Sequence, residues 1–554
     1  MEFKKYYLDK TEITPLNAYV KAEIVPLKGY VKDISDSTRS TEDDDDHDAI
    51  SLCIGKYGRW QLILTFLLSL FNIPCTWHIF SPTFHAAERK TWCARPANFA
   101  YVEPDEWINV TQPHGPCSII NASLITHWPP ENTSNWPLVN CESWEFDGEG
   151  ETIISEFSLL CDRKYLNNVS EMMFLAGVAI GGFVCGLISD KFGRKKTLMG
   201  SVLIQTILGV LIAVTPWFEM YFILRAILGF ISVSVVFSGF VLSIELVGGI
   251  WRTVAGIAYL FPLSLSYASI AGMAYLLRDW RHLQLAISLP GMLFLGLWWV
   301  LPESPRWLHA MGRTKELREV LQHAAHINRK PLPENFEKLL LPTSVESNSS
   351  AGILDLFRTA KMRKITLLLS VIWFTVYLIY YGLVLNVGNI GGDLYVNSAL
   401  SGLVEVPAIA ISIVFLLKMG RRWPMTLTLV FSGISCLLII PIKWATSDLQ
   451  WLVTSLSMFG KFLVSSSNAV VPVFTAELYP TTMRNLGVGA SNVSAGIALM
   501  LVPYLFETEA IHFSLPLVII GFFGVVGGSC VLFLPETGNG PLKETLEDEK
   551  EQPQ

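Results

Sequence analysis

The chain contains long stretches with almost no charge, and these constrain its fold more than any other feature of the sequence. Residues 198–218, 284–301, 398–417 and 512–534 each run for about 20 residues, the length that a helix needs to cross a bilayer. Only 16% of the 554 residues are charged and 51% are hydrophobic, whereas soluble domains have about 25% charged residues. A soluble enzyme, a nucleic-acid-binding protein and a secreted disulfide scaffold are therefore disfavoured.

The spacing of the apolar segments predicts an all-α membrane protein with twelve spans. The spans lie near 60–82, 168–188, 197–216, 218–242, 253–277, 283–301, 365–387, 395–417, 423–442, 450–475, 485–506 and 512–534. They divide the chain into an N-half (60–301) and a C-half (364–534), joined by a charged intracellular linker (302–363). A polar N-terminal segment (1–59) and a short tail (535–554) complete the chain.

Basic residues set the expected orientation of the spans. They gather between spans 2 and 3 and between spans 8 and 9, whereas the loops after spans 3, 7 and 11 carry none. The positive-inside rule then places both termini in the cytoplasm. The first 50 residues lack an apolar run, so we expect no cleaved signal peptide.

The loop between spans 1 and 2, residues 83–167, is then extracellular. It holds four cysteines, for which two disulfides with three alternative connectivities are expected: Cys93, Cys117, Cys141 and Cys161. It also holds three Asn-x-Ser/Thr sequons that predict glycosylation: Asn109, Asn121 and Asn132.

The two halves repeat each other. Glu245 precedes Arg252 by the same seven residues that separate Glu477 from Arg484. These two pairs lie about 230 residues apart in the chain. Two further segments of the N-half recur at about the same distance in the C-half: Gly193-Arg194 recurs as Gly420-Arg421, and Pro302-Glu303 recurs as Pro535-Glu536. A six-plus-six parallel duplication is typical of secondary transporters, which carry substrate at a site between the halves by alternating access.

The repeated charges fall at the cytoplasmic ends of helices. We expect them to pair across the seam between the halves and to hold an inner gate closed, the alternative being that they only fix topology. Two glycines are expected to allow close helix approach and a tight turn. The gating set comprises Gly186, Asp190, Gly193, Arg194, Glu245, Arg252, Glu303, Arg306, Gly420, Arg421, Glu477, Arg484 and Glu536.

Five residues of the C-half form the candidate substrate site. Trp373, Tyr377 and Tyr380 share one helix face, and aromatic faces attract ammonium groups. Glu405 and Lys461 are ionisable residues inside spans, where charge is costly and usually functional. Alternatively, the aromatic residues only pack, and Glu405 and Lys461 only pair with each other to stabilise the C-half.

Several segments resemble known transporters. Residues 186–196 resemble the signature loop of the major facilitator superfamily, and residues 302–308 resemble a motif that sugar porters share with organic-ion transporters. Residues 152–162, 279–290 and 476–487 are more specifically similar to the organic cation/anion/carnitine transporters, solute carrier family 22. The resemblance covers nearly the whole chain.

This resemblance implies a plasma-membrane carrier of organic cations, carnitine and other zwitterions, or organic anions. Insect members include carriers of amine and amino-acid derivatives such as carcinine or β-alanine. In the family, Trp373 and Tyr380 align with aromatics that line the cavity, and Glu405 and Lys461 also match the family pattern.

Two positions depart from that pattern. Gly496 stands in span 11 where family members usually carry a charge, and Val236 replaces a cavity aromatic of cation carriers. Both changes weaken the prediction of a simple organic cation as substrate. The uncharged position in span 11, with Glu405 and Lys461 available, favours a zwitterion.

The sequence therefore predicts a secondary transporter of organic cations or small amine-containing zwitterions. An organic-anion carrier, a sugar porter and a solute sensor are the weaker alternatives. The sequence shows no catalytic constellation, ATP-binding loop or metal motif, so no cofactor is expected, and it assigns no coupling ion.

Overall fold

The computed structural model describes residues 49–333, 356–445, 449–479 and 484–537, apart from 122–124, 126–127, 131–135 and single residues at 88, 114, 149 and 250. Five expected features lie wholly or partly outside these residues, one of them the sequon at Asn121, whose residues 122 and 123 are not described. The other four are the N-terminal segment, part of the linker, the tail and the sequon at Asn132.

The N-half consists of long apolar helices, several of them broken at proline. Pro82 begins α5, Pro262 lies in the first turn of α12, and Pro290 separates α13 from α14, because proline lacks the amide hydrogen that continues a helix. The helices are α3 (Arg59–Ser69), α4 (Asn72–Phe80), α5 (Pro82–His85), α8 (Tyr165–Phe192), α9 (Arg194–Ala213), α10 (Phe218–Glu245), α11 (Trp251–Ala258), α12 (Phe261–Leu276), α13 (Trp280–Ser288) and α14 (Gly291–Leu295), followed by the 3₁₀ turn η5 (Gly296–Trp299).

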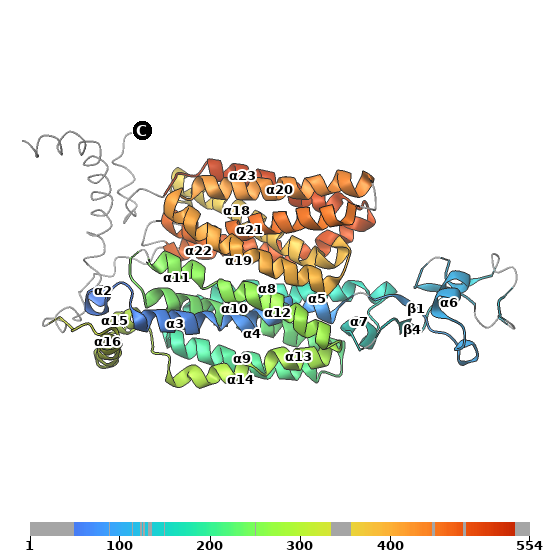
Figure 1. Ribbon diagram of the computed structural model, residues 1–554, viewed down its shortest axis with the longest axis horizontal. Helices are drawn as coiled ribbons and strands as arrows, with labels where there is room; N and C mark the ends of the chain where they lie inside the picture. The colour runs from blue at the N-terminus through green and yellow to red at the C-terminus, as the bar shows by residue number, and fades with distance from the viewer. Residues whose placement is uncertain are drawn as a thin grey trace, which may run out of the picture.

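The C-half has fewer breaks. Its helices are α18 (Ala360–Leu385), α19 (Leu394–Lys418), α20 (Arg422–Ala445), α21 (Gln450–Leu478), α22 (Arg484–Leu505) and α23 (Leu515–Leu532), with 3₁₀ turns η7 (Asn386–Ile390) and η9 (Phe506–Ala510). Figure 1 shows this half lying over the N-half, with the long helices of both running in nearly the same direction.

Ten helices in the described part of the chain are long and apolar enough to cross a membrane, and the bent pair Cys161–Gly182 and Val184–Phe192 makes an eleventh. The remaining expected span, near 450–475, coincides with α21. This helix buries Ser465, Ser466, Ser467 and Lys461 inside the protein. Because protein rather than lipid surrounds these polar groups, α21 can be less apolar than its neighbours.

The long helices carry exposed apolar residues on one face and buried residues on another, as helices that cross a membrane within a bundle should. On α9, Leu203, Ile207 and Leu211 are exposed at helical spacing, whereas Leu208 and Ile212 are buried. A large buried cluster joins the halves and includes Phe80 and Tyr267 of the N-half.

Two ends of the molecule carry additional structure, as Figure 1 shows. The linker end has the short helices α2 (Ala49–Ile54), α15 (Pro305–Ala310) and α16 (Thr314–Asn328). The opposite end has the loop domain, which contains β1 (Thr91–Cys93), η1 (Ala97–Phe99), α6 (Pro104–Thr111), β2 (Ser118–Ile120), β3 (Leu138–Asn140), β4 (Trp144–Phe146), α7 (Ile153–Glu156) and η4 (Cys161–Arg163).

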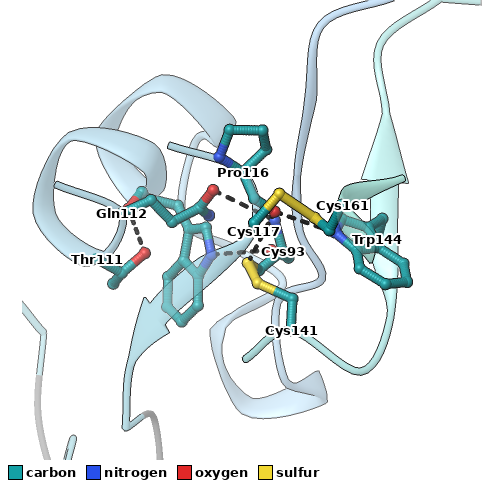
Figure 2. The surroundings of a disulfide bond; sticks show 9 residues. Cys93, Thr111, Gln112, Pro116, Cys117, Cys141, Trp144 and Cys161 are labelled. Atoms are coloured by element: carbon teal, nitrogen blue, oxygen red, sulfur yellow. Dashed lines mark hydrogen bonds between the residues drawn. A yellow bond between two sulfur atoms is a disulfide. The ribbon is translucent and has the colours of Figure 1, made fainter. Parts of the chain in front are cut away.

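Two disulfides hold the loop domain together. Of the three connectivities that the sequence left open, the structure has Cys93–Cys141 and Cys117–Cys161, each with its Cα atoms 5.6 Å apart. Figure 2 shows the two bonds side by side, with Trp144 donating a hydrogen bond of 3.0 Å to the carbonyl of Pro116. Two short antiparallel pairs, β1 with β4 and β2 with β3, complete the domain.

Candidate functional site

Glu405 of α19 and Lys461 of α21 form a buried ion pair. The Lys461 Nζ atom lies 2.8 Å from Glu405 Oε1, and each side chain is only 2% exposed. Charges so deeply buried persist only when they are paired and hydrogen-bonded. The structure therefore brings together the two intramembrane charges that the sequence singled out in the C-half.

Two hydroxyl groups complete the surroundings of Glu405. Tyr380 of α18 donates a hydrogen bond of 2.8 Å to Glu405 Oε1, and Ser264 of α12 donates one of 3.2 Å to Oε2. Ser264 belongs to the N-half, so this carboxylate is held from both halves. We call Glu405, Lys461, Tyr380 and Ser264 the charge-pair site.

Lys461 also rests on an aromatic ring. Its Nζ lies 3.2 Å from the centroid of the Tyr380 ring, within the range of cation–π attraction. A carboxylate beside an aromatic face forms a receptor for an ammonium group, and here the protein's own ammonium group fills it.

Aromatic side chains of α18 stack on one another along the helix. Trp373 stacks on Tyr377 with centroids 5.6 Å apart, and Tyr377 stacks on Tyr381 at 6.3 Å. Tyr380 instead turns to Glu405 and meets Tyr381 edge-on. The stack thus runs through residues four apart and includes Tyr381, which the sequence analysis did not single out.

Other contributors lacked any signal in the sequence. Trp373 donates a hydrogen bond of 2.9 Å to Thr475 of α21, and Ser264 of the N-half donates one to Glu405 of the C-half. A serine or threonine in an apolar helix is too common to single out, so only the packing of the helices reveals these partners.

At the linker end, Arg194 anchors the N-half charges. Its guanidinium lies 3.1 Å from Glu245 at the end of α10 and 2.7 Å from Asp190, whose side chain is 64% exposed. Arg306 and Arg252 donate hydrogen bonds to backbone carbonyls near the same helix end, at Glu245 and Val247. Cations are favoured there because the last carbonyls of a helix lack partners.

Glu303 caps the start of α9. Its Oε1 accepts hydrogen bonds from the backbone amides of Arg194 (2.9 Å) and Lys195 (3.0 Å), which have no partner within the helix. Gly193 makes this possible, since its φ is +102° and an added Cβ would lie 2.5 Å from Glu303 Oε2. The expected tight turn is confirmed at this position.

The C-half repeats this cap and ion pair with equivalent residues. Glu536 accepts hydrogen bonds from the backbone amides of Arg421 (2.8 Å) and Arg422 (3.1 Å), and Gly420 has φ +81°. The Arg421 guanidinium lies 3.0 Å from Glu477 of α21. The sequence repeat therefore corresponds to a repeated cap and a repeated ion pair.

Two expectations about these charges are wrong. Arg194 and Arg421 pair with acids of their own halves rather than across the seam. Arg194 begins α9 and Arg421 directly precedes α20, and these helices pack beside α10 and α21, whose last turns hold the paired acids. Gly186 has only an ordinary contact at 3.8 Å, and α8 approaches α10 closely at Gly177 and Gly181 instead. Arg484 begins α22, but its side chain lies outside the described set.

Aromatic and polar contacts join the halves at the loop-domain end. Tyr395 of the C-half stacks on Phe84 with centroids 5.9 Å apart, and its hydroxyl accepts a hydrogen bond of 3.2 Å from Arg278. Elsewhere on the seam, Asn168 in the first turn of α8 donates a hydrogen bond of 2.6 Å to Glu507 of η9. These contacts join the two halves in this conformation.

Comparison with known proteins places the chain in a family. A family model described as "Sugar (and other) transporter" matches residues 163–548. The organic cation transporter protein of Drosophila melanogaster is 34% identical over 91% of this chain and 94% of its own length. Human solute carrier family 22 member 13 is 34% identical over 89% of this chain and 91% of its length.

The chain belongs to solute carrier family 22 of the major facilitator superfamily. Human solute carrier family 22 member 2 is 36% identical over 75% of each chain. The solved structure of the proton:xylose symporter XylE has a TM-score of 0.59 at 16% identity, covering 88% of this chain and 99% of that one. At that identity the likeness supports the fold alone.

This solute carrier is a multi-pass membrane transporter, and its relatives are transporters rather than enzymes. The structure also gives a reason for its uncharged residue in span 11. A Cβ at Gly496 would lie 2.6 Å from the Cβ of Ala179 on α8, so a longer side chain does not fit there in this conformation. Val236 packs against the N-half core and accepts a hydrogen bond from Tyr259.

Proposed function

We propose that the protein is a plasma-membrane secondary carrier of organic cations or small amine-containing zwitterions, working by alternating access. The charge-pair site carries this proposal. An anionic carboxylate and an aromatic face converge near the seam between the halves, the surroundings that an ammonium group requires. The name "organic cation transporter" of a relative supports the same substrate class.

The ion pair favours a zwitterion within that class. A substrate ammonium that takes Glu405 must displace Lys461, and a pure cation then leaves the lysine unpaired in a buried place. A zwitterion supplies a carboxylate for Lys461 as well as an ammonium for Glu405. Binding of a zwitterion therefore replaces the Glu405–Lys461 pair with two pairs between protein and substrate, and neither buried charge is left unpaired.

An uptake screen in oocytes tests this function. Tetraethylammonium, carnitine, carcinine, β-alanine, p-aminohippurate and glucose would be compared with and without sodium, against water-injected cells and with surface biotinylation. We expect uptake of at least one amine, with carnitine, carcinine or β-alanine above tetraethylammonium. Transport of only p-aminohippurate or glucose would contradict the proposal, and better transport of tetraethylammonium would contradict the zwitterion preference.

We infer that residues 60–301 and 364–534 move as two bundles and that the linker-end pairs control this motion, with the linker end facing the cytoplasm. Arg194→Ala and Glu245→Gln should each slow initial uptake several-fold, since they break a half-buried pair between α9 and α10. Asp190→Asn should have a smaller effect because that carboxylate is largely exposed. The measurement is initial uptake rate normalised to surface protein, and equal rates in all three variants and the native protein would remove the gating role.

A further inference from the structure

An arginine at the loop-domain end lies between tyrosines of the two halves. The guanidinium carbon of Arg278 lies 4.7 Å from the ring centroid of Tyr275 at the end of α12 and 4.8 Å from that of Tyr395 at the start of α19. The two rings meet edge-on with centroids 5.7 Å apart. Arg278 also donates a hydrogen bond of 3.2 Å to the Tyr395 hydroxyl. These three residues, which we call the seam latch, therefore join the N-half to the C-half.

The contacts of the seam latch can break during transport. Arg278 and Tyr275 are exposed to solvent, where cation–π contacts are individually weak. Phe84 of α5 adds one more contact from the N-half, because its ring stacks on Tyr395 at 5.9 Å. Since Tyr395 belongs to the C-half and its partners to the N-half, the halves separate at this end only when the seam latch opens.

The loop domain fixes the backbone of Arg278. Arg89, two residues before β1, donates hydrogen bonds to the carbonyls of Gly150 (2.7 Å) and Arg278 (3.4 Å). A Cβ added at Gly150 would lie 2.7 Å from the carbonyl carbon of Arg278, so the two backbones are in contact. Two residues further on, the amide of Trp280 donates a hydrogen bond of 3.0 Å to the carbonyl of Glu151. This part of the loop therefore lies directly on the segment that carries the seam latch.

The loop residues at this contact extend from the strand pair β1–β4. Thr91 pairs with Phe146, and next to them the amide of Asp147 donates a hydrogen bond of 2.9 Å to the carbonyl of Lys90. The disulfide Cys93–Cys141 ties β1 to the segment that leads into β4. The contact with Arg278 therefore continues the strand pair of the loop domain.

We propose that the seam latch is the gate at the loop-domain end and that the loop domain controls it by positioning Arg278. The latch is closed in this conformation, and substrate entry from this side requires Arg278 to leave Tyr395. Because Arg89 and Gly150 fix its backbone, Arg278 loses less conformational freedom when it contacts Tyr395, which raises the fraction of closed protein. This inference rests on the proposed function, since alternating access is what requires such a gate.

Thiol labelling from the loop-domain side tests the gate. Ser398 is fully buried on α19, one turn after Tyr395, so Ser398→Cys reports separation of the halves. Oocytes expressing the full chain with this change would be treated with a membrane-impermeant biotin-maleimide, and labelled surface protein would be compared with total surface protein. Protein without Ser398→Cys gives the background from the native cysteines. We expect Arg278→Ala and Tyr395→Ala each to raise the labelling rate roughly three-fold or more, because each removes the latch and shifts the population toward the open state.

Two glycines of the loop provide a matched control. Gly150 and Gly148 have nearly the same φ, +84° and +87°, so alanine strains both backbones alike. A Cβ at Gly150 meets the backbone of Arg278, whereas a Cβ at Gly148 would meet no atom of the described residues within 4 Å. Gly150→Ala should therefore raise the labelling rate as Arg278→Ala does, and Gly148→Ala should match the native rate. Equal rates in the two glycine variants would overturn control by the loop domain.

Uptake kinetics separate a gate from a structural role. More protein presents an open site when the latch is removed, so the apparent KM of the best amine should fall several-fold in Arg278→Ala. A loss of stability alone would lower the surface amount and leave KM unchanged. Native labelling rates in both Arg278→Ala and Tyr395→Ala would overturn the seam latch but leave the transport function standing. Absence of uptake of every probe would count against the transport function, and labelling, which needs no substrate, would still decide the latch.

Discussion

Replacing Glu405 with glutamine should reduce amine uptake by a factor of roughly ten or more. The variant leaves Lys461 buried without its carboxylate, and breaking one side of a buried pair costs about 3–5 kcal/mol. It also removes the anion that we propose receives the substrate ammonium. The measurement is initial uptake of the best amine from the screen, normalised to surface protein. Full activity in Glu405→Gln would assign this residue to the scaffold alone.

A double variant separates substrate binding from folding. Lys461→Met alone leaves Glu405 unpaired and should lower the surface amount, whereas Glu405→Gln with Lys461→Met removes both charges and should restore it. We expect the restored protein to remain inactive toward amines. Glu509→Gln, an exposed acid of the same half, is the control and should match the native protein. An active double variant would show that the pair does not bind substrate.

The second large effect is expected where the loop domain meets the N-half. Glu156 of α7 accepts hydrogen bonds from Trp280 (2.7 Å) and from Arg281 Nε (3.0 Å). Arg281 in turn donates hydrogen bonds of 2.6 Å to the carbonyls of Ala213 and Thr215. Glu156→Ala should destabilise this junction by roughly 1–3 kcal/mol, because it leaves a partly buried guanidinium without its acid. We expect a several-fold loss of surface protein in a biotinylation assay.

An exposed pair in the same loop domain provides the comparison. Lys90 and Asp105 form an ion pair whose side chains are 53% and 72% exposed. Such pairs contribute about 0–1 kcal/mol, so Asp105→Asn should leave the surface amount unchanged. Equal losses in Glu156→Ala and Asp105→Asn would mean that the Glu156–Arg281 contact does not secure the loop domain.

Much of the fold follows from one-dimensional patterns. Long apolar runs predict helices that cross a membrane, since a bilayer requires every backbone amide to bond within its own helix. The internal repeat predicts two related halves, since Gly193-Arg194 and Glu303 recur as Gly420-Arg421 and Glu536. Both halves show the same helix cap. Cysteine content predicts two disulfides, but sequence spacing leaves their connectivity open.

Part of the candidate site could also be predicted. A charged side chain within an apolar span costs free energy, so Glu405 and Lys461 can be singled out from the sequence, and the two side chains do form a pair. Their partner Ser264 and the neighbouring Tyr381 could not be found in the same way, because their residue types are ordinary in membrane helices. The seam pairing expected for Arg194 and Arg421 failed because sequence places charges at helix ends without saying which helix lies next to them.

The sequence by itself determined that this protein is a helical membrane transporter of duplicated design, because apolar length, charge bias and internal repeat are properties of the chain read in order. Only the tertiary structure decided which charges meet. Glu405 with Lys461, Arg194 with Glu245, and Gly496 against Ala179 bring together residues from different helices. Rotation and packing of whole helices set these distances, and no local pattern along the chain encodes them.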